Sequence, residues 1–312
     1  MVGTALLIVA LLLATYSNSF FFQIMVTTVI GGLSGGIGSI GVTIAGDADN
    51  NTRWYGIQVA AEAAAGVALL FVLPITLIPS YGFSGVVYGM VIMILVLFPA
   101  YFYLIRVPLL VPSENAADAD TSRRVERTLS RPSKLLSYLA LIGMVFLFIG
   151  SAAVWAFVER IAAINEFDPE SVGLLLGISL FFAVVGSLAA GAVGDRFGNV
   201  WPYILNCLIL IVGVILIAIT DVLSIYAVGA CLFMFGWAAA FAFLFAVIAN
   251  VDPDGKHIAL SVPAVGLGSM IGPGFTGFLL SGDSTRSLLI MCVVTILISV
   301  ILVWATGRKA ES

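Results

Sequence analysis

Long runs of apolar residues fill most of this chain, and polar residues collect in short segments between them. No Asp, Glu, Lys or Arg occurs before Asp47. A hydrocarbon core of ~30 Å is crossed by ~20 apolar helical residues, whereas the strands of a membrane β-barrel would alternate apolar and polar positions. The pattern therefore predicts ten membrane helices, at about 2–16, 20–45, 54–78, 83–105, 136–158, 171–193, 201–220, 222–249, 258–281 and 287–305.

The composition supports the same interpretation. The chain is 61% hydrophobic and only 10% charged, while a soluble domain carries about 25% charged residues. Too little polar surface remains to cover a globule in water. We predict an all-α fold, a polytopic helical bundle whose main partner is the lipid bilayer.

The basic residues indicate an orientation, because Lys and Arg concentrate on the cytoplasmic side of membrane proteins. With Met1 in the cytoplasm and helices that alternate in direction, Arg160 and Arg286 fall outside. The other basic residues all fall on the cytoplasmic side: Arg53, Arg106, Arg123, Arg124, Arg127, Arg131, Lys134, Arg196, Lys256, Arg308 and Lys309. We therefore expect a multi-pass protein of the cell (inner) membrane with both termini in the cytoplasm.

An internal repeat organises the predicted helices. A shift of 203 residues carries each of the first four helices onto one of the last four, and Asp49 onto Asp252. The helices at 136–158 and 171–193 have no counterpart, so the repeat predicts two pseudo-symmetric six-helix halves, the first lacking its opening pair. The expected domains are a partial four-helix bundle at 1–106, a cytoplasmic linker at 107–135, a six-helix bundle at 136–306 and a cytoplasmic tail at 307–312.

The loop after the helix at 171–193 carries spaced glycine and charged residues, Gly191, Asp195, Arg196 and Gly198. Gly191 permits close helix approach, Asp195 can face the positive end of a neighbouring helix, and Gly198 permits a tight turn. This group resembles the GxxxDRxG signature of the major facilitator superfamily in its second-half copy. Asn199 departs from the basic residue that often follows there. An ordinary polar turn is the alternative interpretation.

The resemblance implies a two-lobed carrier in which this loop latches a cytoplasmic gate. It also implies that the helices at 136–158 and 222–249 line a central cavity. On the first of these, Ser151, Trp155 and Glu159 recur every four residues and share one face, and Arg160 follows. The alternative is an interfacial charge pair, Glu159 and Arg160, with Trp155 in an aromatic belt.

The helix at 222–249 presents Phe233, Trp237 and Phe241, again every four residues. Such rings would form a wall on which flat or apolar substrates stack. A lipid-facing stripe of the same residues is the alternative, since hydrocarbon accepts aromatic rings equally well.

Glu62 lies about eight residues into its span, at a depth of ~12 Å. An ionised carboxylate is costly there, so Glu62 is either an acid that couples to protons or contacts substrate, or a neutral group hydrogen-bonded for packing. Gly272 and Pro273 interrupt the helix at 258–281, and they serve either close packing or bending during transport.

The sequence thus predicts secondary active transport of a small molecule by alternating access, with proton coupling as a hypothesis. The rival interpretations are a non-transporting membrane fragment, from a mis-called start or a degraded gene, and a membrane-embedded enzyme. We expect no enzyme activity, no cofactor and no metal, because no phosphate-binding GxxxxGK[ST], HExxH or GxSxG pattern occurs. No basic face suggests a nucleic-acid partner.

Overall fold

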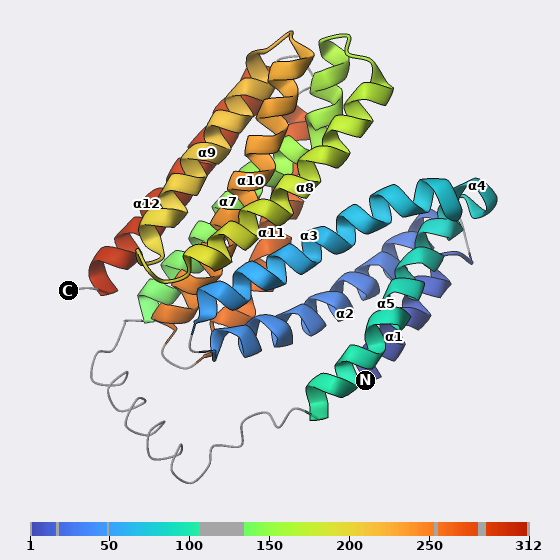
Figure 1. The fold of residues 1–312 in the computed structure, drawn as a ribbon, viewed down its shortest axis with the longest axis horizontal. Helices are drawn as coiled ribbons and strands as arrows, with labels where there is room; N and C mark the ends of the chain where they lie inside the picture. The colour runs from blue at the N-terminus through green and yellow to red at the C-terminus, as the bar shows by residue number, and fades with distance from the viewer. Residues whose placement is uncertain are drawn as a thin grey trace. The chain divides into compact units, whose positions relative to one another are not determined.

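The computed structural model describes residues 2–16, 19–48, 50–106, 134–252, 255–279 and 285–310. The elements in these ranges are all helices (Figure 1), and no strand occurs within them. In chain order they are α1 (Val2–Leu13), α2 (Phe20–Gly46), α3 (Asn51–Thr76), α4 (Ile78–Tyr81), α5 (Phe83–Arg106), α7 (Lys134–Ile164), α8 (Pro169–Val193), α9 (Val200–Ile219), α10 (Leu223–Val251), the 3₁₀ helix η1 (Ile258–Leu260), α11 (Ser261–Leu279) and α12 (Thr285–Ala310).

Each predicted span coincides with a helix, so the all-α prediction is confirmed. Eight helices of the described chain are long and apolar enough to cross a membrane. The prediction differs most at α1, which has 12 residues rather than a span over 2–16. At 1.5 Å per residue α1 measures ~18 Å. It ends at Leu13 because Thr15 and Tyr16 donate tighter i→i−3 backbone bonds.

Contacts divide the chain into two compact units. Unit 1 comprises Met1–Gly38 and Ala68–Arg131, and unit 2 comprises Ser39–Val67 and Pro132–Ser312. Unit 2 therefore contains the second part of α2 and the first part of α3 together with the C-terminal helices. The domain boundaries expected from the sequence stay a prediction, and the expected linker lies mostly outside the described residues.

Unit 1 has a small apolar core. Leu11 on α1 packs with Val87 and Val91 on α5, and Ile30 on α2 covers them. The short helix α4 turns the chain from α3 into α5, and Gly82 takes a φ of +54° in that turn. A positive φ is a conformation that glycine adopts without strain.

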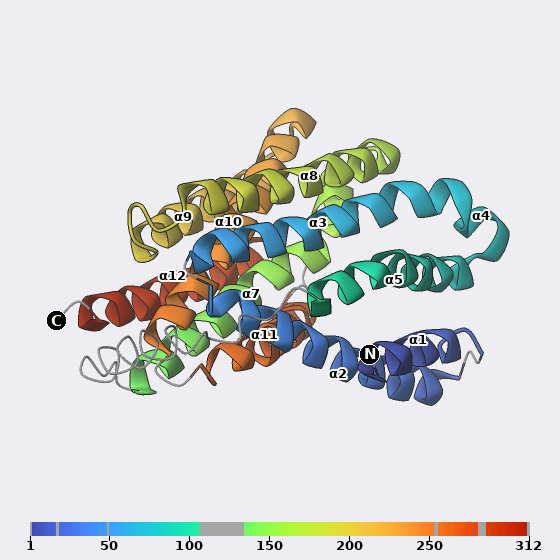
Figure 2. The same ribbon diagram turned by 60° about the horizontal axis from the view of Figure 1, so that its bottom comes forward.

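The C-terminal part of unit 2 is a six-helix bundle in which α10 is central (Figures 1 and 2). α10 packs against α9 and α8, while α7 packs against α12 and α11. The apolar stretch of α10 is 78% buried inside the protein, against 33% for that of α12. α10 therefore forms the core of unit 2, and the other helices of the bundle keep one face outward.

Glycines at the helix crossings let the backbones approach closely. A Cβ added at Gly213 of α9 would lie 2.5 Å from the backbone nitrogen of Phe233 on α10. One added at Gly268 of α11 would lie 2.6 Å from the carbonyl oxygen of Val145 on α7. Small residues at such crossings supply the van der Waals contact that holds helices together in lipid, where the hydrophobic effect does not.

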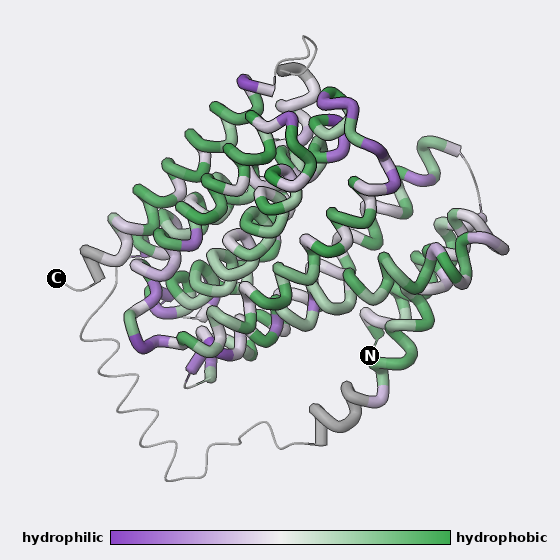
Figure 3. Tube along the Cα trace, turned by 45° about the horizontal axis from the view of Figure 1, so that its top comes forward, coloured by the Kyte–Doolittle hydropathy of each residue, from purple (hydrophilic) through white to green (hydrophobic). Residues whose placement is uncertain are grey.

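The outer surface of the bundle is apolar along the helices, and the polar side chains lie at the helix ends or are buried. Large side chains such as Leu188, Ile290 and Ile301 are exposed, and hydrophilic residues gather at the loops between helices (Figure 3). Buried hydroxyls are paired, as where Tyr203 and Ser299 lie 2.6 Å apart. This arrangement suits a hydrocarbon surround, in which unpaired polar groups are costly.

We predict that Gly272→Ala lowers the thermal unfolding midpoint of the purified protein, followed by intrinsic tryptophan fluorescence. The new Cβ would collide with the carbonyl oxygen of Ile149 on α7, and overpacking of this kind costs about 1–3 kcal/mol. Gly274→Ala is the matched control, because its Cβ would meet nothing within 4 Å. Equal midpoints for both variants would show that the α7–α11 contact does not need glycine.

Candidate functional site

Unit 2 contains a cavity of about 200 Å³ among the helices of its bundle. Four helices, α7, α8, α10 and α11, contribute to its wall. The described residues that line it are Phe148, Ser151, Ala152, Trp155, Leu180, Phe233, Met234, Trp237 and Ser269. The wall carries no charged side chain among these residues.

Aromatic rings from α7 and α10 face one another across this wall. The rings of Trp155 and Phe233 are nearly parallel, with an angle of 5° and centroids 6.4 Å apart. Phe148 meets Trp237 edge to face at 6.0 Å. Such geometries are favourable for ring pairs.

Two hydroxyls give the wall its polarity. Ser151 donates to the carbonyl oxygen of Leu147 one turn earlier, at 2.8 Å. Ser269 contributes a half-buried hydroxyl from α11. Its carbonyl lacks the regular helical donor, because the residue four positions later is Pro273, which has no N–H.

The structure brings together four of the residues singled out from the sequence. Ser151, Trp155, Phe233 and Trp237 all line the cavity. Phe241 lies one turn further along α10, behind the wall, where its ring contacts those of Trp237 and Phe148. Phe233 and Phe241 are buried, so this face of α10 is not a lipid-facing stripe.

The predicted charged groups lie elsewhere. Glu159 and Arg160 are exposed near the end of α7 and do not line the cavity. Glu62 is exposed on α3, where the side chain of Gln58 donates to its carboxylate at 3.2 Å. The cavity of unit 2 is therefore neutral, and a role for these charges in transport stays a prediction.

Sequence reasoning missed Phe148, Ala152, Leu180, Met234 and Ser269. Phe148 and Ala152 could have been found, because they precede Trp155 at helical spacing on the same face of α7. Leu180 and Ser269 gave no such signal, since each is a single contribution from another helix that only packing brings to the cavity.

A row of ring contacts leads away from the cavity along α10. Trp237 contacts Phe241 with centroids 5.8 Å apart, and Phe241 contacts Phe245 at 4.3 Å. Phe245 then stacks on Tyr55 of α3 at 5.1 Å. The hydroxyl of Tyr55 donates to the carbonyl oxygen of Val42 on α2 at 3.1 Å. Within unit 2, the cavity is thus connected by packed rings to the beginning of α3.

One turn before Tyr55, polar side chains join α3 to two other segments of unit 2. The buried hydroxyl of Thr52 bonds Asp195, and it lies 2.9 Å from the Oδ1 of Asn199. The Nδ2 of Asn51 donates to the Oδ1 of Asn250 at the end of α10, at 2.9 Å. We call these five residues the Thr52 junction. Sequence reasoning identified only Asp195 of the five as a functional candidate.

The glycine and charged residues of the α8–α9 loop surround this junction. A Cβ added at Gly56 of α3 would lie 2.6 Å from the backbone nitrogen of Gly191, so the two backbones nearly touch. Asp195 lies against the first turn of α3, where the helix dipole favours an anion. Gly198 takes a φ of +67°, and Arg196 is exposed. The role of this loop as a gate stays a prediction.

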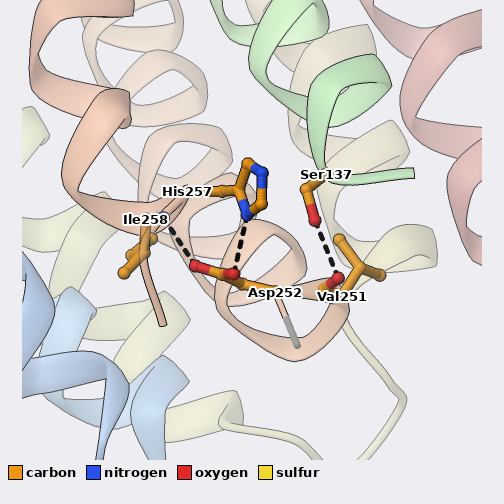
Figure 4. Close-up of polar contacts among 5 residues, drawn as sticks. All are labelled: Ser137, Val251, Asp252, His257 and Ile258. Atoms are coloured by element: carbon orange, nitrogen blue, oxygen red, sulfur yellow. Dashed lines mark hydrogen bonds and ion pairs between the residues drawn. The ribbon is translucent and has the colours of Figure 1, made fainter. Parts of the chain in front are cut away.

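The loop from α10 to η1 is fixed by the carboxylate of Asp252 (Figure 4). The Nδ1 of His257 lies 2.9 Å from one carboxylate oxygen, and the backbone N–H of Ile258 donates to the other at 2.8 Å. Beside it, Ser137 of α7 donates to the carbonyl of Val251 at 2.8 Å. These bonds hold the start of α11 to the end of α10.

The family described as Major Facilitator Superfamily matches residues 140–312. The human organic anion transporter MFSD10 (TETRAN) is similar in structure, with a TM-score of 0.68 and 18% identity over 97% of this chain and 75% of that one. FucP, a Major Facilitator Superfamily transporter in the outward conformation, also gives a TM-score of 0.68, with 15% identity over 97% of this chain and 83% of that one. No curated protein matches this chain significantly in sequence.

We predict that Thr52→Val accelerates amide hydrogen exchange at residues 50–56 and 194–199, measured by mass spectrometry. The substitution removes the hydroxyl that bonds Asp195 and lies beside the Oδ1 of Asn199, and a buried polar group left without its partner costs about 1–3 kcal/mol. Thr43→Val is the matched control, since the hydroxyl of Thr43 bonds only the carbonyl of Ser39 on its own helix. Unchanged exchange in Thr52→Val would mean that the junction does not hold these segments together.

Proposed function

This chain belongs to the Major Facilitator Superfamily, and on that premise we propose that it carries a small molecule across the membrane by alternating access. The observation that carries the proposal is the neutral aromatic cavity of unit 2, connected by packed rings to the Thr52 junction. Alternating access requires such a connection, because occupation of the binding site and the opening of one side of the protein must depend on each other.

The Thr52 junction acts as the latch of the cytoplasmic gate. Its bonds join the start of α3 to the α8–α9 loop and to the end of α10. The basic residues Arg53 and Arg196 at this end of the protein support a cytoplasmic orientation for it. The bonds join small side chains and are worth about 0.5–1.5 kcal/mol each between neutral groups and about 1.5–3 kcal/mol to the carboxylate of Asp195, so the latch is weak enough to open during a transport cycle.

The ring row couples the cavity to this latch. Trp237 lines the cavity, and its contacts run through Phe241 and Phe245 to Tyr55, one turn from Thr52 on α3. A ligand that moves Trp237 must repack the next ring, because closely packed cores shift between discrete arrangements rather than deform continuously.

We propose in addition that Glu62 couples transport to protons. The carboxyl group lies within a span of α3 and accepts a hydrogen bond from Gln58 on its own helix. A carboxyl group in a span binds and releases protons as the water around it changes. We expect Glu62→Gln to abolish proton-driven uptake while exchange of substrate across the membrane continues.

We predict that a cysteine at Ala152, a cavity-lining position, reacts with a membrane-impermeant maleimide from both sides of the membrane. The assay uses right-side-out and everted vesicles, with Cys207, Cys231 and Cys292 replaced by alanine. Thr52→Val should raise the reaction rate from the cytoplasmic side severalfold, because weakening the latch by about 1–3 kcal/mol favours the open gate.

Leu188→Cys serves as the control for this assay, because Leu188 is an exposed apolar residue on α8 that would face lipid. Its thiol should react from neither side. Reaction of the Ala152→Cys thiol from one side alone, both with and without Thr52→Val, would contradict alternating access.

We further predict that dicyclohexylcarbodiimide, which modifies protonated carboxyl groups, labels Glu62 and that the labelling falls as pH rises. The reagent enters from lipid and so reaches a carboxyl group within a span. Glu170, an exposed residue in the first turn of α8, is the internal control and should stay unlabelled at neutral pH. Mass spectrometry that finds Glu62 unlabelled at every pH would remove it from a proton-coupling mechanism.

A further inference from the structure

We propose that the transported molecule presents an uncharged aromatic group of one or two rings, with one hydrogen-bonding substituent, to the cavity of unit 2. This inference rests on the proposed function, because it takes the cavity to be the substrate site. It is carried by three properties of the described wall, namely its volume, its lack of charge and the placement of its two hydroxyls.

The volume sets the size of the group. The cavity measures about 200 Å³. A dry apolar cavity of ~150 Å³ in another protein accepts benzene, whereas pockets for drug-sized ligands measure ~300–1,000 Å³. One ring, or two fused rings, therefore fits the cavity that Trp155, Phe233 and Trp237 line, where it packs against their rings.

The lack of charge selects a neutral group. None of the described residues that line the cavity is charged, and burying an ion without a partner is strongly unfavourable. A cation over the ring faces would recover only part of that cost. A carboxylate or phosphate would recover nothing from the negative faces of Trp155 and Trp237.

The hydroxyls limit the polarity of the group. The one hydrogen of the Ser151 hydroxyl is donated to Leu147, so toward a ligand this hydroxyl can only accept. Ser269 offers its hydroxyl to the cavity. A phenolic hydroxyl or an indole N–H finds an acceptor there. A sugar would bury several hydroxyls without partners, which is unfavourable for each of them.

The test is equilibrium binding to the full chain in lipid nanodiscs, followed by ¹⁹F NMR. The probes are 4-fluorophenol, 4-fluorobenzoate, 4-fluorobenzyltrimethylammonium and a fluorinated glucose. We expect saturable binding of 4-fluorophenol alone, above the non-saturable partitioning seen with empty nanodiscs. Trp237→Ala should weaken that binding about tenfold, because the variant loses one ring face and its buried area.

Trp201→Ala is the matched control, since Trp201 lies on α9 with 70% of its surface exposed and does not line the cavity. It should bind 4-fluorophenol as the unmodified chain does. Ser269→Ala leaves the ring faces intact, so it provides a second variant if Trp237→Ala fails to fold. It should weaken binding of 4-fluorophenol but not of 4-fluorotoluene, which has no hydroxyl.

Saturable binding of the benzoate, the ammonium compound or the sugar, lost in Trp237→Ala, would overturn the proposed substrate class. Binding of 4-fluorophenol that neither Trp237→Ala nor Ser269→Ala weakens would overturn it as well. Neither result bears on the proposal of alternating access, because the maleimide assay tests that proposal without any ligand. Conversely, phenol binding at the cavity in a chain that fails the maleimide assay would support the ligand class and reject transport.

Discussion

In hydrocarbon a backbone N–H or C=O finds no water to bond, and this constraint governs the whole architecture. Helices satisfy the backbone within each segment, so every described element is helical. With lipid on the outside, apolar side chains give no drive toward the interior, and glycines such as Gly213, Gly268 and Gly272 hold the helices by close backbone contact instead. Polar side chains are retained inside only where they are paired, as Tyr203 and Ser299 are.

The helix α10 contacts several different parts of unit 2 along its length. Gly229 and Gly236 bring it onto α9, while Phe233 and Trp237 turn toward the cavity. Phe241 and Phe245 continue the row of rings toward α3, and Asn250 ends the helix with a hydrogen bond to Asn51. Because most of this helix is inside the protein, its faces mainly contact other helices rather than lipid.

The Thr52 junction and the cavity differ in the kind of interaction that holds them. The junction consists of short hydrogen bonds between small side chains at helix ends. The cavity is bounded by rings that pack without directional bonds. In the proposed carrier, the bonds give the closed state a defined geometry, and the rings allow the wall to shift when a ligand enters.

The amino-acid sequence by itself determined the fold class and the positions of the spans, because long uncharged runs have one stable arrangement in a bilayer. Helical spacing also singled out Trp155 and Trp237, since residues four apart share a face whatever surrounds them. The spacing left open whether that face met lipid or a cavity. It gave no sign of Thr52 or Ser269, and it marked Asn199 only as a departure from the family signature, because these residues become important only through partners on other helices. Which residues become partners depends on which helices lie close together. The packing of glycines and aromatic rings in the tertiary structure decided that.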